Sequence, residues 1–272
     1  MQHLPSAIEL ANATAAEVRA EIRAGRWTQP TAGLARGYVQ TNLVILPADW
    51  AGEFAEFCRL NARPCPLVEQ TAVGSFEPTV TAPGANLCTD VPRYRVFREG
   101  VPETIEPTDI AHLWQDNFVG FLLGCSFTFE NALQAAGLPV RHIDEGRNVP
   151  MYRTAIPCKP AGRFAGDLVV SMRPFAPEHV DRAIELTSRF PTMHGGPIHV
   201  GEPAALGIQD LGQPHFGEAV TIHPGEVPVF WACGVTPQVA LLSARPPIAI
   251  THSPGCMFIT DLRDSECESS AD

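Results

Sequence analysis

The sequence predicts an α+β protein of mixed α/β character, with a larger mixed-sheet lobe and an inserted smaller β-α-β-β lobe. The first observation is its length of 272 residues, enough for one large domain or two modest ones. The second is composition, since 45% hydrophobic and only 18% charged residues, with 22 glycines and 26 prolines, indicate a core joined by many turns. The third is an alternation of helical and strand patterns, which near Met151 changes to a β-α-β-β order. These observations favour two lobes.

The first 150 residues carry the patterns of the larger lobe. Thr14 and Glu17 have the spacing of a capping box, which predicts a helix over 15–24. The apolar run 38–46 predicts a buried strand. Pro47 then opens a helix whose buried face is Trp50, Phe54, Phe57 and Cys58. Further expectations are short strands at 67–73 and 94–97, a surface excursion over 74–108, and a helical pattern over 109–136 with a break near Gly124.

Residues 151–218 form the predicted smaller lobe. It comprises a strand at 166–172, a helix at 177–190 with proline in its first turn, and short strands at 198–200 and 205–208. The chain then returns to the larger lobe over 219–272, with strands expected at 220–222, 228–231, 248–251 and 257–259. From Asp261 onward five acids face one arginine, so residues 263–272 are predicted to be a solvated, mobile acidic tail.

Charge and cysteine usage restrict the partners. A formal net charge of −11 argues against nucleic acid and against an anionic membrane, because both need a basic face. A small carboxylate stays compatible, since one arginine can dominate a pocket. No run approaches the roughly 18 apolar residues of a membrane span, and no basic-then-apolar leader is present. We therefore expect a cytoplasmic protein with reduced thiols, either a monomer or a homo-oligomer.

Two candidate sites place reactive side chains, a cysteine in one and arginines in the other, at turns rich in glycine or proline. Cys125 precedes a helix that Ser126 could cap, a position that stabilises a thiolate, although a buried structural cysteine is the alternative. Arg153 lies at a strand end, as does Arg173 beside Ser171, and either guanidinium could clamp a substrate carboxylate. A surface arginine that pairs with a local acid is the alternative there.

Two further segments supply imidazoles. His194-Gly-Gly-Pro-Ile-His199 combines glycines, which let backbone amides approach a ligand, with groups that titrate near neutrality. Metal binding by both histidines with an acid such as Asp210 or Glu226 is the alternative, although the spacing is not that of a helical zinc motif. A general base at His194 predicts a pH limb near about 6.5.

Cys233, and later His252, follow predicted strands at sharp turns. The predicted catalytic residues are His194, His199, Cys233, His252 and Cys125, and the predicted substrate-binding residues are Arg153, Arg173, Ser171, Gly195, Gly196, Thr236 and Gln238. No cofactor is predicted, and a divalent metal remains the alternative. No nucleotide-binding or serine-hydrolase motif is present.

Six segments, taken in order, resemble one known family. They are RGYVQTNLVILP (36–47), GCSFTFE (124–130), GDLVVSMRP (166–174), HGGPIH (194–199), FWACGVTPQ (230–238) and ITHSPG (250–255). Over residues 5 to about 262 the chain resembles the "putative hydro-lyase" family of the DUF1445 (UPF0317) type. The resemblance implies a two-lobed α+β fold and carbon–oxygen lyase activity on a small amino or hydroxy acid.

A characterised relative in this family is mitochondrial D-glutamate cyclase, which removes water from D-glutamate to give 5-oxo-D-proline and carries a further C-terminal domain. The resemblance therefore implies a cyclase-like hydro-lyase. A ligand-binding or regulatory protein of amino-acid metabolism without turnover, and a metal-dependent enzyme, are the alternatives.

Overall fold

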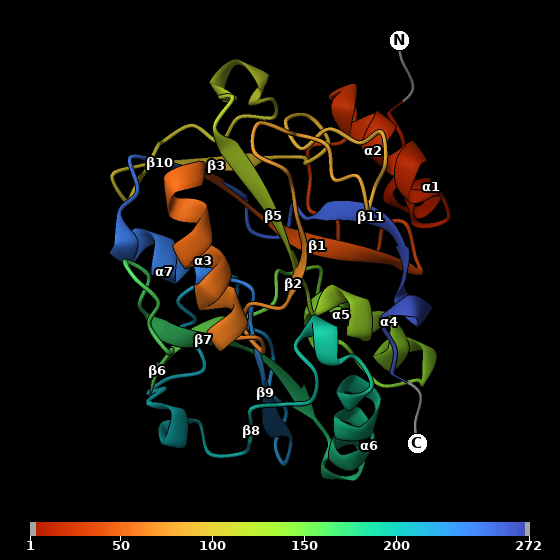
Figure 1. Cartoon of the computed structure of the whole chain (residues 1–272). Coiled ribbons are helices and arrows are strands. Elements are labelled where there is room, and N and C mark those ends of the chain that lie inside the picture. The colour runs from red at the N-terminus through yellow and green to blue at the C-terminus, as the bar shows by residue number, and fades with distance from the viewer. Residues whose placement is uncertain (1–3, 270–272) are drawn as a thin grey trace.

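The computed structural model describes residues 4–269, and its larger sheet has β1 at the centre (Figure 1). The strand order is β2 (Leu67–Gln70), β5 (Phe118–Gly124), β1 (Tyr38–Pro47), β10 (Ile248–His252), β3 (Tyr94–Arg98) and β4 (Val101–Pro102), and β11 (Phe258–Arg263) also pairs with β1. Nine of the ten residues of β1 are buried, which explains the apolar run over 43–46; the polar residues at 40–42 are buried as well. The buried strand predicted at 38–46 is confirmed.

A second, four-stranded sheet lies below the first in Figure 1. Its order is β6 (Met151–Pro157), β7 (Asp167–Phe175), β9 (Val227–Ala232) and β8 (His199–Val200). All pairings between the named strands of both sheets are antiparallel. The predicted α+β class is confirmed. Because β9 follows residue 218, this sheet takes strands from both sides of the predicted lobe boundary.

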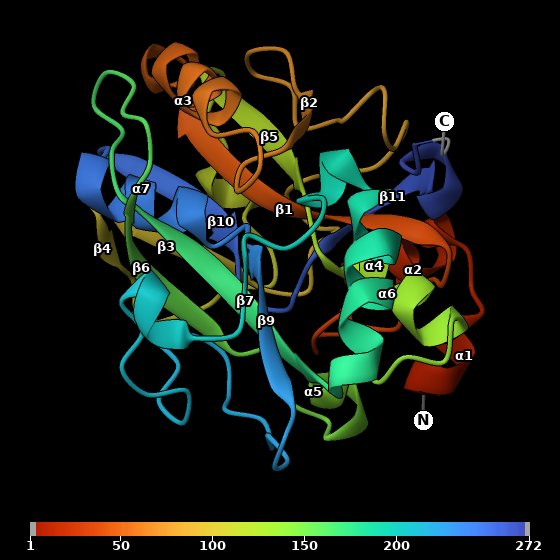
Figure 2. The same ribbon diagram turned by 90° about the horizontal axis from the view of Figure 1, so that it is seen from below.

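Helices cover the two sheets. They are α1 (Ala7–Ala11), α2 (Ala15–Arg23), α3 (Ala48–Leu60), α4 (Phe127–Ala135), α5 (Arg141–Asp144), α6 (Pro177–Ser188) and α7 (Thr236–Ala244), with 3-10 turns η1 (Ala111–Leu113), η2 (Pro191–Met193), η3 (Pro203–Leu206) and η4 (Asp264–Glu266). The capping box of Thr14 and Glu17 is present at the start of α2. Figure 2 shows α4 and α6 side by side, and these two helices are in contact. No helix within residues 4–269 is long and apolar enough to cross a membrane.

One hydrophobic core joins the two sheets. Phe54 of α3 packs edge-on against Phe121 of β5 at 4.9 Å between ring centroids and against Phe164 at 5.3 Å. The same cluster includes Tyr152 of β6 and Phe230 of β9. The face of α3 predicted to be buried is buried, because it fills the space between the sheets. The shared core holds the strand ends of both sheets close together.

Some predicted elements are wrong. Residues 118–124 form a strand instead of part of a helix, and all seven are buried between β1 and β2. A strand covered on both faces has no polar alternation, so its apolar pattern cannot be told from that of a buried helix. The strand expected at 205–208 lies in the turn η3 and the residues after it, and residues 220–222 form no strand. Helix α7 was not predicted.

The acidic C-terminal segment is attached to the body of the protein through residue 269, in contrast to the predicted mobile tail. Asn131 Nδ2 of α4 donates to Asp264 at 2.8 Å, and the Ser269 N–H donates to the Arg189 carbonyl at 2.7 Å. An ion pair between Arg189 and Glu268 adds to these contacts. The rest of the predicted tail, residues 270–272, lies outside the described residues.

Candidate active site

The site lies where the central strand β1 changes neighbours. Gln40 and Thr41 pair with β11, whereas Val44 and Ile45 pair with β10. Between these two pairings, the Leu43 N–H donates to ring atom Nδ1 of His252 at 3.1 Å. A side chain therefore takes the place of a strand partner at the point where β10 ends and the chain turns away towards β11.

A small cavity of about 30 Å³ lies at this junction. Its polar lining residues are Asn42, Cys125, Ser126, Asn148, His194, Cys233 and His252. Four of the five predicted catalytic residues are thus brought together, and they come from the ends of β5, η2, β9 and β10. A volume of this size is sufficient for one or two water molecules.

Two glycines allow the turns of the site to meet. A Cβ atom on Gly124 would lie 2.3 Å from the Thr192 carbonyl oxygen, so the loop that carries His194 packs directly on the end of β5. A Cβ atom on Gly234 would lie 2.1 Å from Nδ2 of Asn42, whose amide donates to the Gly124 carbonyl at 2.8 Å. The loop that carries His194 can pack on the end of β5, and the turn next to Cys233 can approach Asn42 of β1, because neither glycine has a side chain.

Cys125 and Cys233 occupy equivalent positions, each between the end of a buried strand and the start of a helix. Burial raises the pKa of Cys125 to about 12 and that of Cys233 to about 11. Hydrogen bonds from the Phe127 and Val235 N–H groups lower both values but do not outweigh burial. The expected stabilisation of a Cys125 thiolate by its helix is therefore insufficient, and both groups are neutral thiols near pH 7.

The two histidines of the cavity are also neutral near pH 7, because burial lowers the pKa of His194 and of His252 to about 4. Nδ1 of His194 donates to the Arg63 carbonyl at 2.7 Å, which leaves Nε2 as a buried, unprotonated atom that no donor reaches, although the Gly124 carbonyl is also close to the ring. Nδ1 of His252 accepts from Leu43, which leaves the proton on Nε2. One imidazole can accept a proton and the other can donate one.

Arg173 lies directly behind the cavity and does not point into it as a free clamp. Its Nε donates to the Glu130 carboxylate at 3.0 Å, and the exposed fractions of the two side chains are only 1% and 2%. Burial alone would raise the pKa of Glu130, but Arg173 and His142 together hold it at about 2. The remaining Arg173 donors reach the hydroxyl oxygens of Ser171 and Ser126, each at 3.0 Å.

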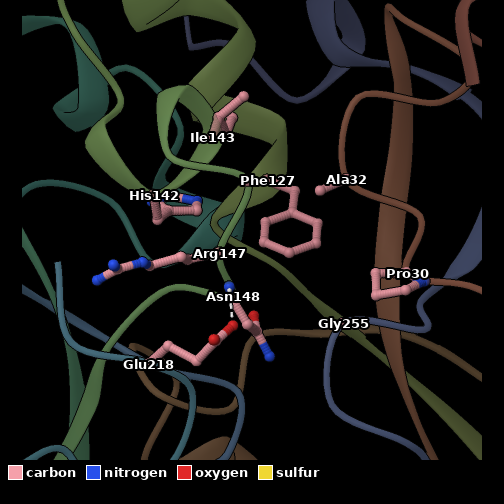
Figure 3. A pocket seen from close by; sticks show the side chains of 10 residues that line it. Pro30, Ala32, Phe127, His142, Ile143, Arg147, Asn148, Glu218 and Gly255 are labelled. Atoms are coloured by element: carbon pink, nitrogen blue, oxygen red, sulfur yellow. Dashed lines mark hydrogen bonds between the residues drawn. The ribbon is translucent and has the colours of Figure 1, made fainter.

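A larger pocket of about 270 Å³ adjoins the cavity and shares Phe127, Asn148 and Gly255 with it. Figure 3 shows the Phe127 ring in its centre, between His142 on one side and Ala32 on the other. The Asn148 N–H donates to the Glu218 carboxylate at 3.1 Å, and these two residues form the side of the pocket that is lowest in Figure 3. We refer to this space as the outer pocket and to the 30 Å³ space as the inner cavity.

The other predicted residues lie outside the lining of the inner cavity. His199 Nε2 contacts the Glu202 carbonyl at 2.9 Å, and the exposed Arg153 lies over the Phe216 ring at 5.6 Å. Thr236 bonds the Val169 backbone at the start of α7, where Gln238 is also buried. The predicted residues that do not line the inner cavity are His199, Arg153, Arg173, Ser171, Gly195, Gly196, Thr236 and Gln238.

The predicted metal-ligand set does not converge. Glu226 is bonded to Arg141 at 2.5 Å, and Asp210 accepts from Gly212 and Gln213 of its own loop. No group of three or more His, Cys, Asp or Glu side chains within residues 4–269 is arranged to hold a metal ion.

Sequence reasoning missed Asn42, Ser126, Glu130, His142 and Asn148. Asn42 and Glu130 share a signal that could have been used, since each is a polar residue next to large apolar residues. Asn42 is the last of three polar residues, 40–42, in a strand that is buried over 39–47, and Glu130 lies on the buried face of α4. A buried polar side chain needs a partner, so its presence in such a run indicates a site.

Comparison with known proteins supplies independent information. A family model described as D-glutamate cyclase matches residues 119–261. A "putative hydro-lyase" of Rubrobacter xylanophilus is 59% identical over 254 residues, 93% of this chain and 98% of that protein. A protein of Bacillus licheniformis with the same description is 58% identical over 250 residues, which are 92% of this chain and 95% of that protein. YcsI of Bacillus subtilis, also described in this way, is 56% identical over 248 residues, which are 91% of this chain and 96% of that protein. A nitrogen repressor-like protein of Methanococcus jannaschii gives a TM-score of only 0.38 at 10% identity over 90% of this chain and 97% of that one.

Proposed function

The chain belongs to the hydro-lyase family that carries a D-glutamate cyclase domain, and from this premise we propose that it converts D-glutamate to 5-oxo-D-proline and water. In this reaction the α-amine attacks the γ-carboxyl carbon, a C–N bond forms and a C–O bond breaks. The ammonium group loses two protons, and both leave with the carboxylate oxygen as water. An enzyme for this reaction has to neutralise two charged groups and move protons from nitrogen to oxygen.

The single observation that supports the proposal best is the neutral, desolvated character of the inner cavity. Burial lowers the pKa of His194 and His252 and raises that of Cys125 and Cys233, so all four groups are uncharged near pH 7. The same desolvation lowers the pKa of a bound ammonium group and raises that of a bound carboxyl group. Such a cavity therefore favours the amine and carboxylic acid pair that can cyclise over the zwitterion that cannot.

The opposite tautomers of the two histidines provide a route for the protons. Nε2 of His194 has a free lone pair and can accept a proton from the amine. Nε2 of His252 carries a proton and can donate to the departing oxygen. The two thiols line the same cavity and are protonated, so they add neutral donors without adding charge. Groups of this kind typically contribute about 10²–10⁴-fold each to a rate.

The two adjoining spaces match the shape of the reaction. The inner cavity is too small for the whole substrate, whereas the outer pocket is of the size of a small amino acid. In the proposed complex, the carbon chain and the α-carboxylate of the substrate lie in the outer pocket. Its amine and γ-carboxyl group reach past Phe127 into the inner cavity. The amide of Asn148, which lines both spaces, is a suitable partner for the substrate at their boundary.

Incubation of the purified protein with D- and L-glutamate and related amino and hydroxy acids tests the proposal. We expect D-glutamate to be consumed with loss of primary amine and of the mass of one water. Thermal stabilisation by D-glutamate without product would instead indicate a binding protein. Turnover of a different acid would retain the hydro-lyase class and reject this substrate.

A further inference from the structure

Ser126 occupies the N-cap position of α4 but does not cap the helix. Its backbone is helical, with φ −63° and ψ −18°, and its side chain makes no hydrogen bond to the first turn. Serine is favoured at N-caps because its oxygen accepts such a bond, which typically stabilises a helix by about 1 kcal/mol. Here the oxygen accepts from Nη2 of Arg173 at 3.0 Å instead. The hydroxyl is therefore oriented by a buried guanidinium and not by its helix.

This arrangement leaves the hydroxyl proton available. A serine hydroxyl has one proton to donate and two lone pairs, and a guanidinium cannot accept a hydrogen bond. Arg173 therefore occupies a lone pair and cannot bind the proton. No acceptor for the proton is found among residues 4–269, and Ser126 lines the inner cavity. An oxygen atom placed in that cavity is the acceptor that the geometry provides for.

We infer that Ser126 is a catalytic residue that donates a hydrogen bond to the γ-carboxyl oxygen of the substrate, and that Arg173 is the positioning residue that holds it as a donor. The inference rests on the proposed function. As the amine nitrogen bonds to the carbon of the γ-carboxyl group, the electron pair of its C=O bond moves to this oxygen, and the Ser126 O–H stabilises the charge. The carbonyl reforms when the other oxygen leaves as water, and no bond to Ser126 forms.

Buried charges behind Ser126 strengthen this role. Arg173 polarises the hydroxyl, and a hydrogen bond that is supported by a charged donor is stronger than a neutral one. Glu130, within 3.0 Å of Nε, balances the guanidinium charge. The cavity thus presents a polarised donor and no net positive charge, which preserves the neutral environment that the cyclisation needs.

The chain offers a matched pair of variants. Ser126→Ala and Ser171→Ala each remove one serine oxygen that accepts from Arg173 at 3.0 Å, but only Ser126 lines the inner cavity. We expect both variants to lose a similar amount of thermal stability. The kcat for D-glutamate should fall by about 10²–10³ in Ser126→Ala, as on removal of an oxyanion donor, with little change in KM. Ser171→Ala should lose much less.

Equal kinetic losses in the two variants would overturn the inference, because both serines would then merely hold Arg173. If Ser126→Ala does not fold, Ser126→Gly replaces it, since glycine is well accepted at N-caps. A wild-type protein without turnover contradicts the proposed function separately. The comparison is then made by thermal shift with D-glutamate and 5-oxo-D-proline, where equal shifts in both variants, or none in the wild type, reject the role of Ser126.

Discussion

His194 combines two unusual properties in one residue. Its backbone has φ 76°, a left-handed conformation that costs a residue other than glycine on the order of 1–3 kcal/mol. Its Nε2 is buried without a partner, which adds a further cost. The surrounding structure imposes both features through the Arg63 carbonyl and the end of β5. Strain concentrated at a single side chain within a cavity is expected where that side chain has a chemical role.

Replacement of His194 by asparagine should separate the structural role from the chemical one. Asparagine tolerates the left-handed region, and its amide can replace Nδ1 as the donor to Arg63. We expect His194→Asn to melt close to the wild type, while kcat falls by about 10²–10⁴. A normal rate per folded molecule, measured together with the melting curve, would remove His194 from the reaction. His252→Asn is the parallel variant, because the asparagine oxygen can accept from Leu43.

Burial also changes the pH profile expected from the sequence. A typical imidazole would give a limb near about 6.5, but the pKa of His194 and of His252 is about 4. The base is therefore unprotonated throughout the range above pH 5, so kcat should stay nearly constant from pH 5 to pH 8. Initial rates over this range test the point. A limb near 6.5 in the wild type would show that the titrating base is a solvated group and neither of these histidines.

At the scale of the elements, the site depends on close approach of the turn after β9 to β1. Gly234→Ala places a methyl group 2.1 Å from Nδ2 of Asn42, although the backbone there is not left-handed. We expect a loss of about 1–3 kcal/mol in the free energy of unfolding, as for an overpacked core, together with reduced kcat.

Gly52→Ala is the control for Gly234→Ala. Gly52 lies in α3 with no atom within 4 Å of the new methyl group, so the same chemical change should stabilise that helix by about 0.5–1 kcal/mol. Chemical denaturation of both variants measures the two effects. Equal effects at the two positions would contradict the packing argument.

The sequence predicted elements well where a local signal exists. The capping box of Thr14, the strand 38–46 and the buried face of α3 depend on neighbouring residues, and the structure confirms them. The strand Phe118–Gly124 was missed because its burial comes from β1 and β2, which the local pattern does not contain. The period of the hydrophobic residues alone does not identify a strand that is buried on both faces, because such a strand has no alternation of apolar and polar residues.

The site shows the same limit. Turns that combine glycine with Cys125, His194 or Cys233 are visible in the sequence, and the structure brings them together. The partners of Arg173 are not visible, because Glu130 and Ser126 are more than 40 residues away from it along the chain. The sequence predicts that Arg173 is free to bind a substrate carboxylate. Only the tertiary structure shows that Glu130 already occupies it.

For the whole molecule, neutral buried histidines predict sensitivity to mild acid. The unfolded chain binds protons at His194 and His252 near about 6.5, whereas the folded protein binds them only near pH 4. The free energy of unfolding should therefore fall as the pH drops from 6.5 to 4, by on the order of 3 kcal/mol for each histidine. Below about pH 4.5 the unfolded chain also binds a proton at Glu130, which the folded protein does not bind until about pH 2. The free energy of unfolding should therefore continue to fall in this range.

Urea denaturation across this pH window tests the expectation of acid sensitivity. The double variant His194→Asn/His252→Asn is the control, and its stability should depend less steeply on pH. A wild-type stability that does not change between pH 6.5 and pH 4 would mean that the two imidazoles are as accessible to protons in the folded protein as in the unfolded one.

The change of neighbours along β1 has a consequence for synthesis of the protein. One edge of β1 can pair with β5 once about 124 residues have been made, but its other partners, β10 and β11, begin at Ile248 and Phe258. On the ribosome, this strand, which contains the apolar run 43–46, therefore has one edge unpaired while the second sheet is translated. An open apolar edge is a template for pairing with other chains, so this protein is expected to depend on chaperones until its last strands emerge. The inner cavity is completed in that same final step, when His252 binds the Leu43 N–H.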